Sequence, residues 1–204
     1  VKGSIVNFMV RSVKKMVPKY NLPNVVKFSD ALSQGKKFTL QLHKGSPNDT
    51  IIHQYTGGTT GVSKGAMGTH RALVVNCHQL RYWTGSAVGL WDNHQPLSYL
   101  GAIPMFHIYG LLVMLTQCAV DAGQIFLIPN PRDMDEVVDC IDYYKPNVML
   151  GVPALYNAIN NHPDVLAGKY DLSSIKACIS GSAALLRETK EEFERLTGGK
   201  VFEG

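Results

Sequence analysis

The chain has 204 residues, of which 45% are hydrophobic and 18% are charged, so it is long enough to bury a core as one or two units. The net charge of +4 is unevenly spread: residues 1–37 hold eight Lys or Arg and one Asp, a balance of +7, and the remainder carries −3. A body without excess positive charge argues against a general nucleic-acid binder. The longest apolar run, residues 108–120, is too short to cross a bilayer, and no signal peptide is recognisable.

A basic amphipathic helix is predicted at the start of the chain. Its apolar residues recur at helical spacing: Val6, Met9, Val10, Val13 and Met16. Pro18 breaks the pattern. Two interpretations remain open, since such a stripe either packs on the protein, which is the commoner case, or lies on a membrane surface. A second, short helix is predicted from a Ser29 cap to Gln34, with Gly35 ending it.

Residues 55–65 form the most informative stretch, which reads Tyr-Thr-Gly-Gly-Thr-Thr-Gly-Val-Ser-Lys-Gly. Residues 50–55 before it are predicted to form a strand. Thr69 after it is predicted to cap a helix whose buried face carries Leu73, Cys77 and Leu80. The glycine loop is therefore expected to connect a strand to a helix, as many phosphate-binding loops do.

The composition of this loop suits a polyphosphate. Glycines allow positive φ and close backbone approach, successive N–H groups form an anion-binding concavity, and the hydroxyls and the lysine add donors and charge. A plain flexible loop is the alternative, but it would need neither the flanking elements nor the lysine. The stretch is not a Walker loop, because Gly65 follows Lys64 where that motif has Ser or Thr.

A polar stretch at residues 84–96 is the expected subdomain boundary, which divides the chain into residues 1–90 and 97–204. Beyond it, strand-like and helix-like runs alternate. The strands are expected at residues 99–105, 124–129, 147–152, 175–180 and 200–203, and the helices at 109–121, 133–144, 153–161 and 184–197. The second of these helices starts with a capping box, Asp133 to Glu136. This alternation predicts an α/β fold with a mostly parallel sheet and helices on both faces.

Ligands of open parallel sheets bind outside the carboxyl ends of the strands. The loops expected there include residues 106–110, with His107, and residues 180–183, which read Ser-Gly-Ser-Ala. The four cysteines have no metal-ligand spacing and lie in apolar runs, so they are predicted to be reduced, buried thiols: Cys77, Cys118, Cys140 and Cys178.

These segments together resemble the adenylate-forming superfamily, which contains acyl-CoA synthetases, luciferases and peptide-synthetase adenylation domains. The family signature is Tyr-Thr-Ser/Gly-Gly-Thr-Thr-Gly-x-Pro-Lys-Gly, and this chain departs from it at Ser63, where proline is commoner. Residues 65–67 with 69–71, 104–107 and 130–133 are similar to those of bacterial long-chain fatty acid–CoA ligases in particular.

The resemblance implies ATP, Mg²⁺ and coenzyme A as cofactors and a fatty acid as substrate. The implied nucleotide-binding residues of the glycine loop are Thr56, Gly57, Gly58, Thr59, Thr60, Gly61 and Lys64. His107 is implied to position or gate the groups where carboxylate and thiol meet. Gly181, Ser182 and Ala183 resemble the adenine-contacting Gly-Ala-Pro segment, with Ala184 in place of the usual proline. An ordinary strand-to-helix turn capped by Ser180 or Ser182 explains the same residues.

Several expectations remain open at this point. Residues 110–122 line an acyl tunnel or form a plain buried helix. The acceptor is coenzyme A or another group, as in an acyl-AMP ligase or adenylation domain, and a non-catalytic module that binds nucleotide or membrane is a further alternative. By resemblance the family sequence continues from Glu203-Gly204 into Tyr-Gly-x-Thr-Glu, so this chain is expected to be a fragment that alone forms no acyl-CoA. A cytoplasmic location, peripheral membrane contact through residues 1–37 and a homodimer complete the expectations.

Overall fold

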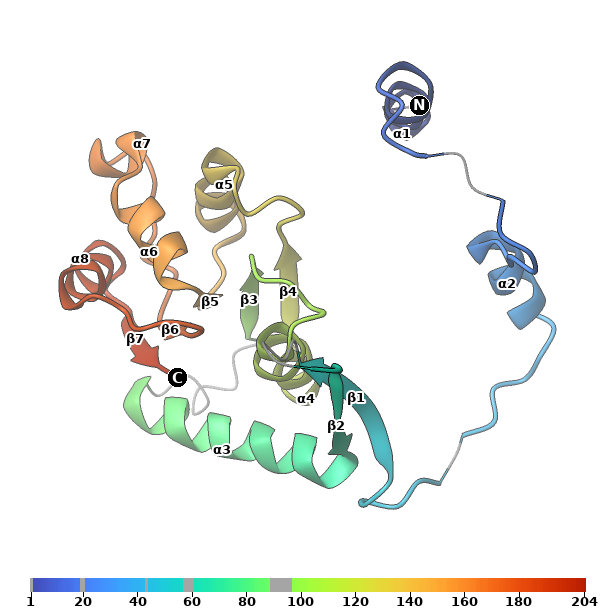
Figure 1. Cartoon of the computed structure of the whole chain (residues 1–204). Helices are drawn as coiled ribbons and strands as arrows, with labels where there is room; N and C mark the ends of the chain where they lie inside the picture. The colour runs from blue at the N-terminus through green and yellow to red at the C-terminus, as the bar shows by residue number, and fades with distance from the viewer. Residues whose placement is uncertain (1, 19–20, 43, 57–60, 89–96) are drawn as a thin grey trace. The chain divides into compact units, whose positions relative to one another are not determined.

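The computed structural model describes residues 2–18, 21–42, 44–56, 61–88 and 97–204, although the side chains of residues 2, 56 and 84–88 lie outside the description. The chain divides into two compact units, Val1–Lys44 and Gly45–Gly204 (Figure 1). The predicted boundary at residues 84–96 falls largely on residues outside the description and stays a prediction.

The first unit consists of helical segments with little buried surface. It contains α1 (Lys2–Phe8), the π-helical segment η1 (Met9–Val13) and α2 (Phe28–Gly35). Helix formation in the first segment agrees with the predicted periodicity, but the described residues of the unit leave most of the apolar stripe uncovered, since Val6 is 58% and Met16 67% exposed. The predicted Ser29 cap is wrong: α2 begins at Phe28, and the Ser29 hydroxyl bonds to the Asp30 side chain instead.

The second unit begins with a β-hairpin that corrects the predicted surroundings of the glycine loop. Strand β1 (Thr50–Thr56) pairs in antiparallel fashion with β2 (Lys64–Thr69), so the loop joins two strands rather than a strand and a helix. The β2 strand escaped prediction because its glycines have low strand propensity. They are needed here: a Cβ on Gly68 would lie 2.5 Å from Ile52 Cγ2, and one on Gly65 would lie 3.2 Å from the Tyr55 ring.

Helix α3 (His70–Val88) follows β2 directly. The Thr69 hydroxyl oxygen accepts a hydrogen bond from the Ala72 backbone N–H at 3.2 Å, which confirms the predicted cap. The predicted inner face of this helix is at least half-buried: Cys77 is 1% exposed, and Leu73 and Leu80 are half-buried. The helix reaches the sheet at its far end, where the Trp83 and Phe202 rings lie 5.4 Å apart in an edge-on arrangement.

A five-stranded parallel sheet forms the centre of this unit and confirms the predicted fold class. Its spatial order is β4-β3-β5-β6-β7. The strands are β3 (Ser98–Gly101), β4 (Gln124–Leu127), β5 (Val148–Gly151), β6 (Ala177–Ser180) and β7 (Lys200–Glu203). Every residue of β5 and β6 is buried, as expected for central strands covered on both faces.

Helices cover the two faces of this sheet (Figure 1). The helical segments after α3 are η2 (Tyr109–Thr116), α4 (Gln117–Val120), α5 (Met134–Tyr144), α6 (Pro153–Asn160), α7 (Pro163–Leu166) and α8 (Arg187–Thr197). The predicted capping box holds in part, since Asp133 Oδ1 accepts from the Glu136 N–H at 3.3 Å. Gly198, at φ 69°, ends α8 as predicted.

The two faces contain separate hydrophobic clusters. One joins α5, α6 and α8 to Leu100, Met149 and Cys178 of the sheet. The other joins η2 and α4 to Tyr99, Val148 and Leu150, the alternate residues of the same strands. All four cysteines are buried and free, which confirms the predicted thiols. No helix in the described part of the chain is long and apolar enough to cross a membrane.

Candidate active site

The carboxyl ends of β5, β6 and β7 form a continuous rim. Beyond the paired strands, the Gly181 N–H donates to the Gly151 carbonyl at 3.1 Å, and the Gly204 N–H donates to the Ser180 carbonyl at 3.0 Å. The loop after β6 is therefore fixed to its neighbours on both sides where it leaves the sheet. This is the edge at which ligands of open parallel sheets bind.

Two tyrosine hydroxyl groups meet at one carbonyl of this rim. The Ile179 carbonyl oxygen accepts a hydrogen bond from Tyr109 Oη at 2.6 Å and another from Tyr156 Oη at 2.7 Å. Tyr109 Oη also lies 3.4 Å from the Gly151 carbonyl oxygen. Burial raises the pKa of both hydroxyls above the ordinary value of 10.0, so both remain protonated donors at neutral pH.

His107 lies on the exposed turn that precedes η2. Its Nδ1 accepts a hydrogen bond from the Tyr109 backbone N–H at 3.2 Å, which leaves Nε2 to carry the ring proton of the neutral imidazole. The turn depends on Gly110, because a Cβ there would lie 2.3 Å from the Pro104 carbonyl oxygen. His107 is therefore presented on a tightly closed turn beside Tyr109, and its predicted role as a positioning or gating residue stays a prediction.

The predicted adenine segment lies beside Tyr109. Gly181 is buried, and a Cβ on it would lie 3.3 Å from the Tyr109 ring; Ser182 and Ala183 are exposed. Ser182 has a φ of 72°, a left-handed conformation that costs a non-glycine residue about 1 kcal/mol or more. The alternative of a serine-capped turn is wrong, because α8 begins at Arg187 and its cap residue is Leu186.

The glycine loop lies mostly outside the described residues, including Gly57, Gly58, Thr59 and Thr60. Its two ends are described: Thr56 at the end of β1 pairs with Lys64 at the start of β2. Gly61, at φ 123°, has a backbone conformation that side chains disfavour. The hairpin thus places the lysine backbone directly opposite the last strand residue before the loop, at its base.

The predicted acyl-tunnel helix is neither fully buried nor fully open. Within η2, Met114 is completely buried in the second cluster, whereas Leu115 is 40% exposed and Leu111 and Leu112 are half-buried. The predicted alternatives, an acyl tunnel and a plain buried helix, therefore both stay open.

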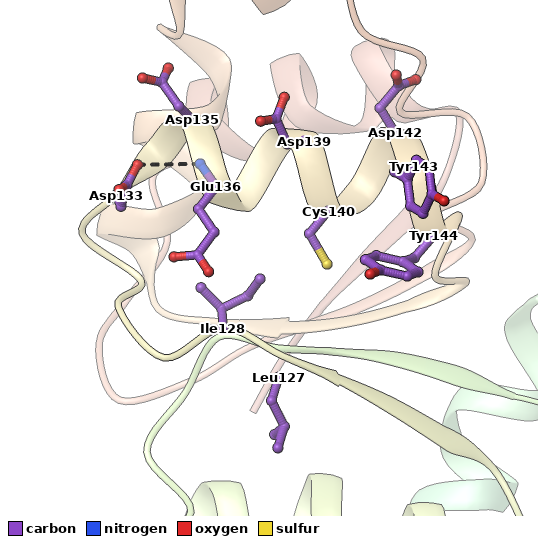
Figure 2. Close-up of a pocket in the computed structure, with 10 residues that line it drawn as sticks. All are labelled: Leu127, Ile128, Asp133, Asp135, Glu136, Asp139, Cys140, Asp142, Tyr143 and Tyr144. Carbon is purple, nitrogen blue, oxygen red and sulfur yellow. Dashed lines mark hydrogen bonds between the residues drawn. The ribbon is translucent and has the colours of Figure 1, made fainter. Parts of the chain in front are cut away.

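An open groove of about 830 Å³ lies elsewhere, along α5 and next to the end of the edge strand β4. Figure 2 shows Asp135, Asp139 and Asp142 pointing away from the strand, with Glu136 and Tyr144 on the side toward it. The five carboxylates that line this groove would repel phosphates and carboxylic acids. The groove is therefore unsuited to an anionic nucleotide, despite its size.

Sequence reasoning placed Tyr109 in a rim loop without giving it a role, and it did not single out Tyr156. A usable signal was present, because a tyrosine in an apolar run must find a partner for its hydroxyl when it is buried. In the described part of the chain, no group of three or more His, Cys, Asp or Glu side chains is arranged to hold a metal ion.

The parallel α/β sheet and the glycine–threonine–lysine sequence that precedes it agree with the adenylate-forming class of enzyme. The family model described as AMP-binding enzyme matches residues 9–204, and the chain belongs to this family.

Curated relatives cover nearly the whole chain. The long-chain-fatty-acid–CoA ligase of Haemophilus influenzae is 35% identical over 100% of this chain, and that of Bacillus subtilis is 38% identical over 89%. The chain spans about a third of the length of these relatives, 35% and 31% respectively.

Solved structures share the fold. ATP-bound MatB from Rhodopseudomonas palustris matches with a TM-score of 0.66 and 28% identity, over 81% of this chain and 30% of that chain. The anthranilate CoA ligase AuaEII, in complex with anthranoyl-AMP, matches with a TM-score of 0.68 over 81% of this chain and 31% of that chain. At 23% identity the second likeness concerns the fold alone.

Proposed function

We propose that the natural protein, meaning the whole product of the coding sequence that contains this chain, is a long-chain fatty acid–CoA ligase. It would use ATP to convert a fatty acid to acyl-AMP and then transfer the acyl group to coenzyme A. The observation that carries this proposal is the identity of 34–38% to several ligases of that name over most or all of the chain.

The chemistry of adenylate formation matches the residues at hand. A carboxylate must attack the α-phosphate of ATP, so two anions approach each other, and catalysis depends on neutralising charge and fixing geometry. In our proposal Thr56, Thr59 and Thr60 bind the β- and γ-phosphates together with the loop backbone. Lys64 adds a positive charge at the base of that loop.

The rim would contribute the other half of the site. We assign the adenine contact to the backbone of Gly181, Ser182 and Ala183, and the meeting point of carboxylate and thiol to the His107 turn. Mg²⁺ would supply further counter-charge to the phosphates. We assign no described residue to the ion.

The direct test is fatty-acid-dependent exchange of pyrophosphate into ATP by the natural protein, followed by detection of the CoA thioester. We expect both activities with long-chain acids. Replacement of Thr59, Thr60 and Lys64 by alanine should reduce exchange by at least about 100-fold, a typical loss when preorganised donors to a transition state are removed. The control is Lys169→Ala, which removes an exposed lysine paired with Asp164 and should leave exchange unchanged.

Other outcomes would replace this proposal. Exchange without thioester would indicate an acyl-AMP ligase or an adenylation domain with another acceptor. Normal exchange by the triple variant would reject the assignment of the glycine loop. We also expect the 204-residue chain alone to form no acyl-CoA, because it spans only about a third of the relatives' length.

A cytoplasmic location with peripheral membrane contact is a separate proposal, and it depends on the first unit. The support is the exposed apolar stripe beside basic residues, which together suit an anionic lipid surface. Flotation of the natural protein with anionic vesicles tests it, and Lys14→Glu/Lys15→Glu should abolish binding. Equal flotation of both proteins would reject the contact. A homodimer stays a prediction.

A further inference from the structure

We propose that Tyr109 is a positioning residue that holds the His107 turn and the loop at residues 181–183 at a fixed spacing. The proposal rests on the proposed function, in which those two segments bind the acyl and adenine parts of the reacting pair. Tyr109 itself would touch neither phosphate nor carboxylate.

Three different parts of Tyr109 make the connection. Its backbone N–H donates to His107 Nδ1 at 3.2 Å, its ring lies beside Gly181 on the side where a Cβ would point, and its hydroxyl donates to the Ile179 carbonyl at 2.6 Å. The backbone of the residue therefore belongs to the histidine turn, and its side chain contacts the end of β6 and the first residue of the loop after it. A shift of either segment relative to the other must break one of these contacts.

The absence of a side chain on Gly181 makes this fit close. A Cβ at that position would lie 3.3 Å from Cε1 and Cζ of the Tyr109 ring, closer than most such contacts, so any larger residue there would displace the ring or the loop slightly. The Gly181 N–H in turn donates to the Gly151 carbonyl, the second oxygen near the Tyr109 hydroxyl. The ring thus lies beside the first residue of the loop, and the hydroxyl bonds to the end of β6 two residues before it.

Tyr156 provides an internal comparison for the same bond. Its hydroxyl donates to the same Ile179 oxygen at 2.7 Å, but it belongs to the cluster formed with α5, α6 and α8. Tyr109 belongs to the cluster on the other face of the sheet. Both tyrosines fix the carbonyl, whereas only Tyr109 also contacts His107 and Gly181. Loss of either hydroxyl should cost similar stability, and only the loss from Tyr109 should disturb the chemistry.

The experiment compares Tyr109→Phe with Tyr156→Phe in the natural protein. Both variants should lower the denaturant midpoint by similar amounts, since each loses a short hydroxyl hydrogen bond to the Ile179 carbonyl. Tyr109→Phe should lower kcat for fatty-acid-dependent ATP–pyrophosphate exchange about tenfold, with the KM for ATP changed less than about threefold, because alignment rather than affinity is lost. Tyr156→Phe should keep kcat within about threefold of the unmutated protein.

Hydrogen exchange gives a second readout that does not depend on the reaction. Amides of residues 180–186 should exchange faster in Tyr109→Phe than in Tyr156→Phe. Equal kcat values and equal hydrogen-exchange rates in the two variants would mean that Tyr109 has only a structural role, and would overturn the proposal. Absence of fatty-acid-dependent activity in the unmutated protein would instead reject the proposed function. The hydrogen-exchange rates of residues 180–186 would still decide whether Tyr109 holds that loop in place.

Discussion

The face of the sheet under α5, α6 and α8 and the face under η2, α4 and α3 bury different kinds of side chain. The first is mainly apolar and aromatic: Phe193 and Tyr156 are both completely buried, with ring centroids 4.9 Å apart. The second buries the carboxylate of Asp121 and the amide of Gln117 beside its apolar cluster. The first face has the larger apolar cluster and also buries the neutral polar side chains of Asn160 and Thr197, whereas the second buries a carboxylate and carries the His107 and Tyr109 segment.

The largest expected effect is on the apolar face. Phe193→Ala should lower the free energy of unfolding by about 3–5 kcal/mol, because it removes a fully buried ring and leaves a cavity beside Tyr156. Urea denaturation followed by circular dichroism measures the change. Leu166→Ala is the control, since this side chain is 60% exposed and its loss should cost much less. A cost below about 1 kcal/mol for Phe193→Ala would mean that this face is not the main source of stability.

The polar face should respond next most strongly, through Asp121. Its Oδ2 accepts from Tyr99 Oη at 3.1 Å and from Gln117 Nε2 at 2.6 Å. Asp121→Ala leaves both buried donors without an acceptor and should lower the free energy of unfolding by about 2–3 kcal/mol in the same urea measurement.

Asp121→Asn separates the hydrogen bonds from the charge. Both donors bond to the same oxygen, Oδ2, and an amide oxygen in its place can accept both hydrogen bonds, so this variant should cost less than half as much as the alanine variant. Arg81 Nη1 lies 3.6 Å from Asp121 Oδ1, and its side chain is 45% exposed, so the ion pair alone should contribute little. Equal costs for the two variants would contradict this division and assign the stability to the charge.

The sequence carried enough information for the elements of the apolar face. The stripe of α5 is spaced by helical turns, and Val137, Val138 and Ile141 are all completely buried. The strand–helix alternation indicated the parallel sheet for the same reason, since the periods of 2 and 3.6 are local properties. Strand β2 has no such signal, because its small residues show neither strand propensity nor alternation.

The candidate site was predictable in composition but not in arrangement. A motif identifies His107 and the segment from Gly181 to Ala183 as chemically suited residues. The bonds from Tyr109 to Gly151 and Ile179 span 42 and 70 residues, and no local pattern specifies such distances. The left-handed φ of Ser182 is also invisible in a sequence, because serine adopts that conformation rarely.

Ser182 offers a smaller effect at the rim where the two faces meet. Ser182→Gly should raise the free energy of unfolding by about 0.5–1 kcal/mol, because glycine relieves the positive φ at some cost in unfolded-state entropy. Ser182→Ala is the matched control, since it removes the same hydroxyl and keeps the Cβ, and should bring no gain. If alanine stabilised the protein as much as glycine, the hydroxyl rather than the backbone would be the source of the cost.

The smallest effect tests whether the helices of the apolar face keep their charges at the surface. Lys145 Nζ lies 3.0 Å from Asp142 Oδ1 and 2.9 Å from Asp171 Oδ2, all on exposed side chains. Hydrogen bonds from Ser173 and then Lys145 lower the pKa of Asp171, and those from Lys145 and then the Asp171 N–H lower the pKa of Asp142. Carboxyls with a lowered folded-state pKa stabilise the fold above their ordinary pKa near 3.8, and this contribution is lost as pH falls through the folded value.

Lys145→Met should therefore lower the urea midpoint at pH 7, and the two proteins should converge as the pH is taken from 4 toward 2. Added salt should also shrink the difference, because the cluster is exposed to solvent. Lys176→Met is the control: its Nζ donates to the neutral carbonyl of Ser173 at 2.6 Å, so its effect should not vary over this acidic range. A difference for Lys145→Met that stayed constant from pH 7 to pH 2 would assign its contribution to packing. The buried carboxylate of Asp121 would then be the electrostatic difference between the two faces that still contributes to stability.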